Sequence, residues 1–180
     1  MITFLIGFMG CGKTTLSNAL NHATGITVAD LDELIESKVG CTIKEFWAKH
    51  GEAAFRELEE STLRQVALSQ TDMIVACGGG TPCYGVNMEI MNSCGQTVWL
   101  TASHDVLLSR LKAGRHKRPL IAAMDDSTLS DYIISELHRR TPFYSKAHVT
   151  FDSSRLENKR DIELTARRFA GLFLKHHGAI

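Results

Sequence analysis

The segment with the clearest chemistry is a glycine-rich loop at residues 7–14, Gly-Phe-Met-Gly-Cys-Gly-Lys-Thr. It matches the pattern G-x-x-x-x-G-K-S/T in full, between a run that predicts a strand and one that predicts a helix. Its glycines let backbone N–H groups surround phosphate oxygens, while Lys13 reaches the β- and γ-phosphates and the Thr14 hydroxyl binds Mg²⁺. The loop therefore predicts binding of a nucleoside triphosphate with Mg²⁺. The residues assigned to the nucleotide are Gly10, Cys11, Gly12, Lys13, Thr14 and Thr15.

This loop does not name the acceptor, because GTPases, ATPases and small-molecule kinases all share it. The small size of the chain and its lack of guanine-reading motifs favour a small-molecule kinase. Two acids, Asp30 and Asp32, could then take different roles, one supporting the magnesium shell and the other accepting a hydroxyl proton. The alternative is a helix N-cap with an acidic first turn, and the spacing leaves both interpretations open.

Two further segments have features that suit an acceptor site. Arg56 could clamp a substrate carboxylate with two parallel hydrogen bonds, although an isolated helix arginine is more often a surface residue. The triple glycine, Gly78 to Gly80, permits close approach of the backbone to a ligand, and its alternative is a flexible turn.

Two arginines nearer the C-terminus complete the candidate set. Arg118 ends a basic stretch that begins at Arg115, and such a stretch could form a mobile lid over the nucleotide and bring Arg118 to the transferring phosphoryl group. A solvated basic loop is the alternative. Arg140 lies near a predicted helix end, where it could instead complement the helix dipole.

Short apolar runs that alternate with longer helical patterns must position these residues. The pattern predicts strands at residues 2–6, 25–29, 73–76, 97–100 and 149–151. It predicts helices at residues 14–23, 31–69 with breaks near Gly40 and Gly51, 106–112, 129–140 and 159–175. Such alternation indicates a parallel sheet covered on both faces, in which ligands bind at the carboxyl ends of the strands. Each glycine or acidic cluster named above follows a predicted strand.

The bulk composition excludes several classes of protein. The chain has 180 residues, 44% of them hydrophobic, a formal net charge of zero and no linker-like tract, which indicates one domain over residues 1–180 and no nucleic-acid or membrane partner. The apolar N-terminus is too short to span a bilayer and lacks the cationic start of a signal peptide. Five scattered cysteines indicate neither disulfides nor a zinc site, and so a cytoplasmic location. The His176–His177 pair is interpreted as a solvated surface pair.

Taken together, in this order and spacing, these segments resemble the shikimate kinases from Ile2 to about Asp152. The resemblance implies an α/β fold of three layers, like that of nucleoside monophosphate kinases, with a five-stranded parallel sheet in the order 2-3-1-4-5. It implies a substrate-binding helical segment at about residues 31–70, a lid at about residues 112–124 and a monomer. It also implies transfer of the γ-phosphoryl group of ATP to the 3-hydroxyl of shikimate, in aromatic amino-acid biosynthesis.

The resemblance assigns the donor side of the site as follows. Lys13 and Thr14 would hold the nucleotide phosphates and Mg²⁺, Asp30 would support the magnesium shell through water, and Arg118 would be the lid arginine. The basic residue that stacks on adenine in this family precedes the lid, and the spacing leaves two candidates, Arg110 and Lys112. The adenine loop would include residues 152–155.

On the acceptor side, the resemblance makes Asp32 the base that contacts the shikimate hydroxyls. Arg56 and Arg140 would bind the shikimate carboxylate, and Arg140 is chosen over Arg139 because the family pattern is Arg-x-Pro-apolar-Tyr. Gly78, Gly79 and Gly80 would line the same pocket, Gly79 most directly.

Two other functions fit part of these features. A kinase of similar fold with another acceptor, such as gluconate, would share the phosphate loop and also bind a hydroxylated carboxylate. A regulatory nucleotide-binding module would share the loop alone. The combination of Asp32, Arg56, Arg140 and the triple glycine favours shikimate over both.

Overall fold

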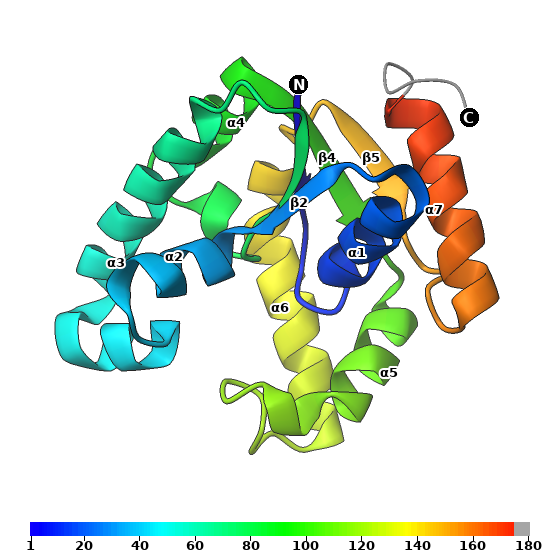
Figure 1. Ribbon diagram of the computed structural model, residues 1–180. Coiled ribbons are helices and arrows are strands. Elements are labelled where there is room, and N and C mark those ends of the chain that lie inside the picture. The colour runs from blue at the N-terminus through cyan, green and yellow to red at the C-terminus, as the bar shows by residue number, and fades with distance from the viewer. Residues whose placement is uncertain (175–180) are drawn as a thin grey trace.

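Five parallel strands form one sheet in the order β2-β3-β1-β4-β5 (Figure 1). The computed structural model of the chain describes residues 1–174. The strands are β1 (Ile2–Ile6), β2 (Thr27–Asp30), β3 (Met73–Ala76), β4 (Gly95–Thr101) and β5 (Val149–Asp152). This sheet confirms both the α/β class and the strand order 2-3-1-4-5.

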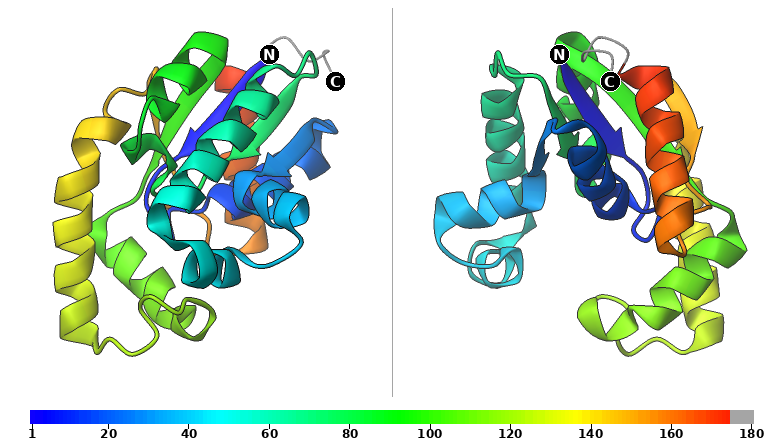
Figure 2. Two further views of the ribbon diagram at one scale, coloured as in Figure 1. Left: turned by 90° about the vertical axis from the view of Figure 1, so that its left-hand side faces the viewer. Right: turned by 45° about the vertical axis from the view of Figure 1, so that its right-hand side comes forward.

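Helices cover both faces of the sheet, which makes three layers (Figures 1 and 2). On one face α1 packs against α7, and Phe169 of α7 meets Phe151 of β5 edge to face. On the other face α4 lies against β4, and Tyr144 of α6 contacts Trp99 of the same strand. The helices are α1 (Lys13–Thr24), α2 (Leu31–Val39), α3 (Ile43–Ala67), α4 (Asn87–Cys94), α5 (His104–Ala113), α6 (Asp126–Tyr144) and α7 (Lys159–Phe173), with short 3-10 turns η1 (Thr81–Cys83) and η2 (Arg115–Lys117).

The central strand β1 is buried along its whole length, with the pattern Ile-Thr-Phe-Leu-Ile. Because helices cover both faces of a parallel sheet, such a strand is apolar throughout rather than alternating. Leu16 and Leu20 of α1 are completely buried in the same core. None of the helices in residues 1–174 is long and apolar enough to cross a membrane.

The register of the sheet brings the ends of three strands to one edge. Leu5 of β1 pairs with Ala76 of β3, and Ala76 pairs in turn with Asp30 of β2. The phosphate loop after β1, the acids at the end of β2 and the triple glycine after β3 therefore leave the sheet side by side. Figure 1 shows α2, α3, α5 and α6 extending beyond this edge.

The predicted elements are present, with differences at several boundaries. The second strand begins at Thr27 rather than Gly25, because Gly25 ends α1 in the left-handed conformation, with φ of 71°. The breaks in residues 31–69 occur where predicted, since Gly40 ends α2 and Gly51 kinks α3 with φ of 81°. Helix α6 continues past its predicted end at Arg140, through Pro142.

The structure also contains helices and turns in segments for which no helix or strand was predicted. Helix α4 and turn η1 were not predicted, because they are short and follow a glycine-rich turn. The basic stretch predicted as a mobile loop contains η2, and the Arg118 N–H donates to the Arg115 carbonyl. His176, His177 and the predicted end of the closing helix at Lys175 lie outside the described residues.

A pair of glycine substitutions tests the close packing of β1 against β4. A Cβ at Gly95 would sit 2.4 Å from the Ile2 carbonyl oxygen, whereas one at Gly171 on α7 would have no neighbour within 4 Å. We expect Gly95→Ala to lower the free energy of unfolding by about 2 kcal/mol, and Gly171→Ala to raise it by roughly 0.5 kcal/mol. Urea unfolding of the two variants and the parent measures both; equal values for the variants would contradict this packing.

Candidate active site

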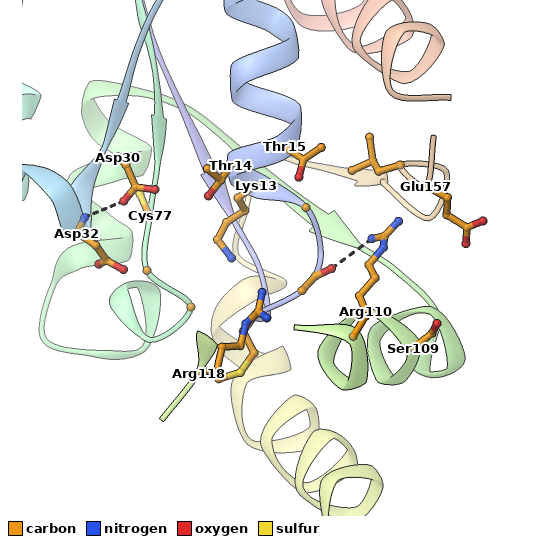
Figure 3. A pocket seen from close by; sticks show the side chains of 17 residues that line it. Lys13, Thr14, Thr15, Asp30, Asp32, Cys77, Ser109, Arg110, Arg118 and Glu157 are labelled. Atoms are coloured by element: carbon orange, nitrogen blue, oxygen red, sulfur yellow. Dashed lines mark hydrogen bonds between the residues drawn. The ribbon is translucent and has the colours of Figure 1, made fainter. Parts of the chain in front are cut away.

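A cavity of about 650 Å³ lies at the edge where the three strands end (Figure 3). Its walls come from the phosphate loop, the β2–α2 junction, the turn after β3, helix α5 and the loop after β5. Figure 3 shows the carboxylates of Asp30 and Asp32 on one side, the Lys13 ammonium in the middle and the Arg110 guanidinium on the other. Segments far apart in the sequence thus contribute opposite charges to one space.

The N-terminus of α1 is built to receive an anion. Gly12 is its N-cap residue, with φ of 97°, and no side chain caps the first turn. In contrast, Asp30 caps α2 and Thr42 caps α3 with side-chain oxygens. The uncapped N–H groups of α1 therefore remain available to phosphate oxygens, which the helix dipole also favours.

The Lys13 side chain lies across this loop. Its Nζ donates to the Gly7 carbonyl at 2.7 Å and to the Phe8 carbonyl at 3.2 Å. Thr14 and Thr15 follow in the first turn of α1 and line the same cavity, as do Gly10 and Gly12. Cys11, by contrast, is buried and outside the cavity wall.

The structure confirms the N-cap interpretation for Asp30, and the catalytic interpretation of Asp30 and Asp32 stays a prediction. Asp30 Oδ1 accepts from the Asp32 N–H at 3.0 Å, so Asp30 is the N-cap of α2. Both carboxylates also line the cavity. The Asp32 Oδ1 atom lies near Gly78, where a Cβ would come within 3.0 Å of it.

Burial raises the pKa of Asp32 to about 6, with the negative charges of Asp30 and Glu59 adding to the effect and Lys13 opposing it. An ordinary aspartate is a weak base at neutral pH. A carboxylate with a pKa near the working pH is a better proton acceptor, because it is still largely ionised yet binds a proton more firmly.

The donor set fits Mg²⁺ rather than a metal held by protein ligands alone. Residues 1–174 contain no group of three or more His, Cys, Asp or Glu side chains that could hold a metal ion. The cavity instead offers the Thr14 hydroxyl and the carboxylates of Asp30 and Asp32, all oxygen donors. Mg²⁺ prefers oxygen, keeps several waters and takes other ligands from substrate phosphates, so these few donors suit it.

Arg56 lies beside the triple glycine and is held by a buried carboxylate. Its Nη1 donates to Glu59 Oε2 at 2.8 Å, and Glu59 Oε1 accepts from the Thr81 hydroxyl at 2.7 Å. Glu59 is only 1% exposed. A Cβ at Gly80 would lie 3.2 Å from Arg56 Nη2, so a side chain there would press on the guanidinium.

Arg140 reaches the same turn from helix α6, whereas Arg139 does not. The Arg140 side chain is 10% exposed and that of Arg139 is 51% exposed, and both pair with Glu136. A Cβ at Gly79 would sit 3.2 Å from Arg140 Nη1. The Nε atoms of Arg56 and Arg140 are buried without a hydrogen-bond partner in the described part of the chain, as expected of groups that await a ligand.

The turn at Gly79 also touches the phosphate loop. A Cβ on Gly79 would lie 3.4 Å from the Gly7 carbonyl oxygen and 3.6 Å from the Met9 nitrogen. The buried Tyr144 hydroxyl donates to the Gly79 carbonyl at 2.5 Å, which holds the peptide that follows Gly79 in one orientation. The turn beside the two arginines therefore adjoins the phosphate-binding loop directly, although Gly80, Arg56 and Arg140 are not among the residues that line the cavity.

Arg118, in the middle of the predicted lid, lines the cavity. Its Nη1 donates to the Gly114 carbonyl at 2.9 Å, so the guanidinium rests on its own segment.

Of the two candidates for adenine contact, the structure favours Arg110. Its guanidinium donates to the carbonyls of Gly10, Ser153 and Ser154, whereas Lys112 pairs with Asp126 outside the cavity wall.

Sequence reasoning missed several residues that shape the site, namely Glu59, Thr81, Ser109, Tyr144 and Glu157. Glu59 could have been found from its place one helical turn after Arg56, but its burial depends on the turn after β3. Cys77, which follows β3 and adjoins the cavity, is buried, and burial raises its pKa.

The chain is similar to known proteins along nearly its whole length. The family model described as shikimate kinase matches residues 9–169. The shikimate kinase of Phocaeicola vulgatus is 45% identical over 160 residues, which cover 89% of this chain and 91% of that protein. The 1.7 Å crystal structure of shikimate kinase from Bacteroides thetaiotaomicron superposes with a TM-score of 0.89 at 40% identity, covering 96% of this chain and 97% of that one. Shikimate kinase from Acinetobacter baumannii, in complex with shikimate, gives a TM-score of 0.80 at 29% identity, covering 97% and 93% of the two chains.

The raised pKa of Asp32 predicts a pH-dependent gain in stability for Asp32→Asn. Because the pKa is about 6 in the folded protein against an ordinary 3.8, the folded state loses stability as the pH rises between these values. We expect the amide to raise the free energy of unfolding at pH 8 by about 1 to 2 kcal/mol and to have little effect near pH 4. Urea unfolding at both pH values, with the exposed Glu57→Gln as control, measures this; an equal difference at both would contradict it.

Proposed function

The chain belongs to the shikimate kinase family, and from this premise we propose how its own residues transfer the γ-phosphoryl group of ATP to the 3-hydroxyl of shikimate. The observation that carries the proposal is the contact of Gly79 with both Arg140 and the phosphate loop. This contact supports a single cavity in which the carboxylate of the acceptor and the phosphates of the donor are held side by side.

Residues 10–15 bind the phosphates of ATP, through the N–H groups of the loop and the first turn of α1. The Lys13 ammonium leaves the loop carbonyls for the β- and γ-phosphates and offsets their charge. When bound, Mg²⁺ is held by the Thr14 hydroxyl and, through water, by Asp30, and it supplies positive charge to the phosphate oxygens.

Arg56 and Arg140 bind the carboxylate of shikimate between them, and Gly78 to Gly80 line the pocket. This places the 3-hydroxyl toward Asp32. As the hydroxyl oxygen forms its bond to the γ-phosphorus, the bond from that phosphorus to the bridging oxygen of ADP breaks, and Asp32 takes the hydroxyl proton. The raised pKa of Asp32 supports this role.

The segment of about residues 112–124 acts as a lid over the nucleotide. On closure, Arg118 exchanges the Gly114 carbonyl for the transferring phosphoryl group and offsets its charge. Closure also excludes water, which would otherwise compete with shikimate as acceptor. The helical segment of about residues 31–70 supplies the acceptor side, within one domain over residues 1–180.

The cellular location and the oligomeric state are proposed from the cysteines and from the residues of the site. Its five cysteines are all free thiols, which supports a reducing, cytoplasmic location. Both substrates are contacted by residues of one chain, which is consistent with a monomer that needs no partner to complete its site.

An assay of ADP release tests the acceptor directly. We expect release with shikimate and very little with gluconate or without an acceptor, because the two arginines and Asp32 suit a compact ring with one carboxylate. Coupled spectrophotometric detection with saturating MgATP measures it. Release with gluconate alone would overturn the choice of acceptor, and binding of ATP without release in any condition would indicate a regulatory module.

Asp32→Asn tests the base. We expect kcat to fall by about 10²- to 10⁴-fold, the usual contribution of a positioned general base, while the variant stays folded. Glu33→Gln, an exposed acid in the same first turn of α2, is the matched control and should leave kcat unchanged. Near-normal turnover in Asp32→Asn would show that the proton leaves by another route.

A further inference from the structure

Tyr84 contacts the Arg56 guanidinium from a different segment of the chain. It follows η1, in the segment that joins the triple glycine to α4, whereas Arg56 is on α3. The Arg56 Cζ lies 3.7 Å from the centroid of the Tyr84 ring, which covers one face of the guanidinium. Phe55 and Trp47 are more distant, with centroids at 5.0 and 5.4 Å, and both belong to α3 itself.

The Tyr84 hydroxyl makes a second contact with α3. It donates to Glu52 Oε1 at 2.7 Å, and the same oxygen lies 3.6 Å from Arg56 Nε. Glu52 is one helical turn before Arg56 and its side chain is 49% exposed, so it has room to move. The Tyr84 hydroxyl is therefore the nearer partner of the Glu52 carboxylate, whose ion pair with Arg56 stays long.

This separation matters for the charge on Arg56. Its Nη1 is already paired with the buried Glu59 at 2.8 Å. A second carboxylate in full contact would leave the guanidinium outweighed by negative charge, and an incoming carboxylate would then be repelled. With Glu52 held by the hydroxyl, its ion pair with Arg56 stays long and lacks a direct hydrogen bond, so more of the positive charge of Arg56 remains available to a ligand.

We propose that Tyr84 is a positioning residue for acceptor binding, whose ring orients the Arg56 guanidinium and whose hydroxyl keeps Glu52 from neutralising it. The proposal rests on the proposed function, because it takes the carboxylate of the acceptor as the ligand of Arg56. It concerns binding alone, since Tyr84 does not line the cavity that holds Lys13, Asp32 and Arg118.

Two substitutions distinguish the role of the Tyr84 ring from that of its hydroxyl. Tyr84→Phe keeps the ring and removes the hydroxyl, and we expect it to raise KM for shikimate by about 3- to 10-fold, the effect of one ordinary hydrogen bond. Tyr84→Leu also removes the ring and should raise this KM further, by about 10- to 30-fold. In both variants kcat and KM for ATP should stay within about twofold of the parent.

Glu52→Gln in the Tyr84→Phe background is the decisive variant. If Glu52 competes for Arg56 once the hydroxyl is gone, removing its charge restores KM for shikimate to near the parent value. A merely structural role of Tyr84 would not be rescued in this way and would lower the melting temperature. Val86→Ala, an exposed change in the same segment, is the control.

Steady-state kinetics of the parent and these variants, with melting temperatures, tests the proposal. A rise in KM for shikimate alone, reversed by Glu52→Gln, supports it. An active parent with unchanged KM in Tyr84→Phe and Tyr84→Leu, or a rise that Glu52→Gln does not reverse, overturns it. A parent that does not phosphorylate shikimate would overturn the proposed function, and this inference with it.

Discussion

The site depends on the close approach of two backbone segments, the phosphate loop after β1 and the triple glycine after β3. At Gly79 no side chain separates the turn from the Gly7 carbonyl, the Met9 nitrogen or the Arg140 guanidinium, each of which would lie within 3.6 Å of a Cβ there. The parallel pairing of β1 with β3 sets this approach, and the Tyr144 hydroxyl holds the Gly79 carbonyl in place. Donor and acceptor can therefore share one cavity without a wall between them.

The charged groups around this edge of the sheet match the groups that the proposed reaction brings there. In the proposed function, Lys13 and the uncapped start of α1 bind the phosphates, Arg56 and Arg140 bind the carboxylate, and Asp32 receives the hydroxyl proton. Neighbouring groups partly offset these charges. Glu59 forms an ion pair with Arg56, and Lys13 opposes the upward shift in the pKa of Asp32. The same burial that makes Asp32 a better base also lowers the stability of the fold when it is ionised, a common cost of an active site.

The sequence predicted the parts of this arrangement that depend on local pattern. The apolar run of β1, the loop pattern ending at Thr14 and the breaks at Gly40 and Gly51 are all visible within a few residues. Helix α4 and the burial of Glu59 were not predictable, because they depend on how α3 packs against the turn after β3. The contacts of Arg110 with carbonyls of the loop after β5, which favour it over Lys112 as the residue near adenine, were likewise visible only in the structure.

In the proposed function, one site holds the acceptor carboxylate at two arginines and the acceptor hydroxyl at Asp32. A crystal structure of the enzyme with shikimate, ADP and Mg²⁺ would show whether it does. We expect the shikimate carboxylate between Arg56 and Arg140, the Gly79 turn against the ring and the 3-hydroxyl oxygen about 3 Å from an Asp32 oxygen. A carboxylate bound away from both arginines, or a 3-hydroxyl out of reach of Asp32, would contradict it.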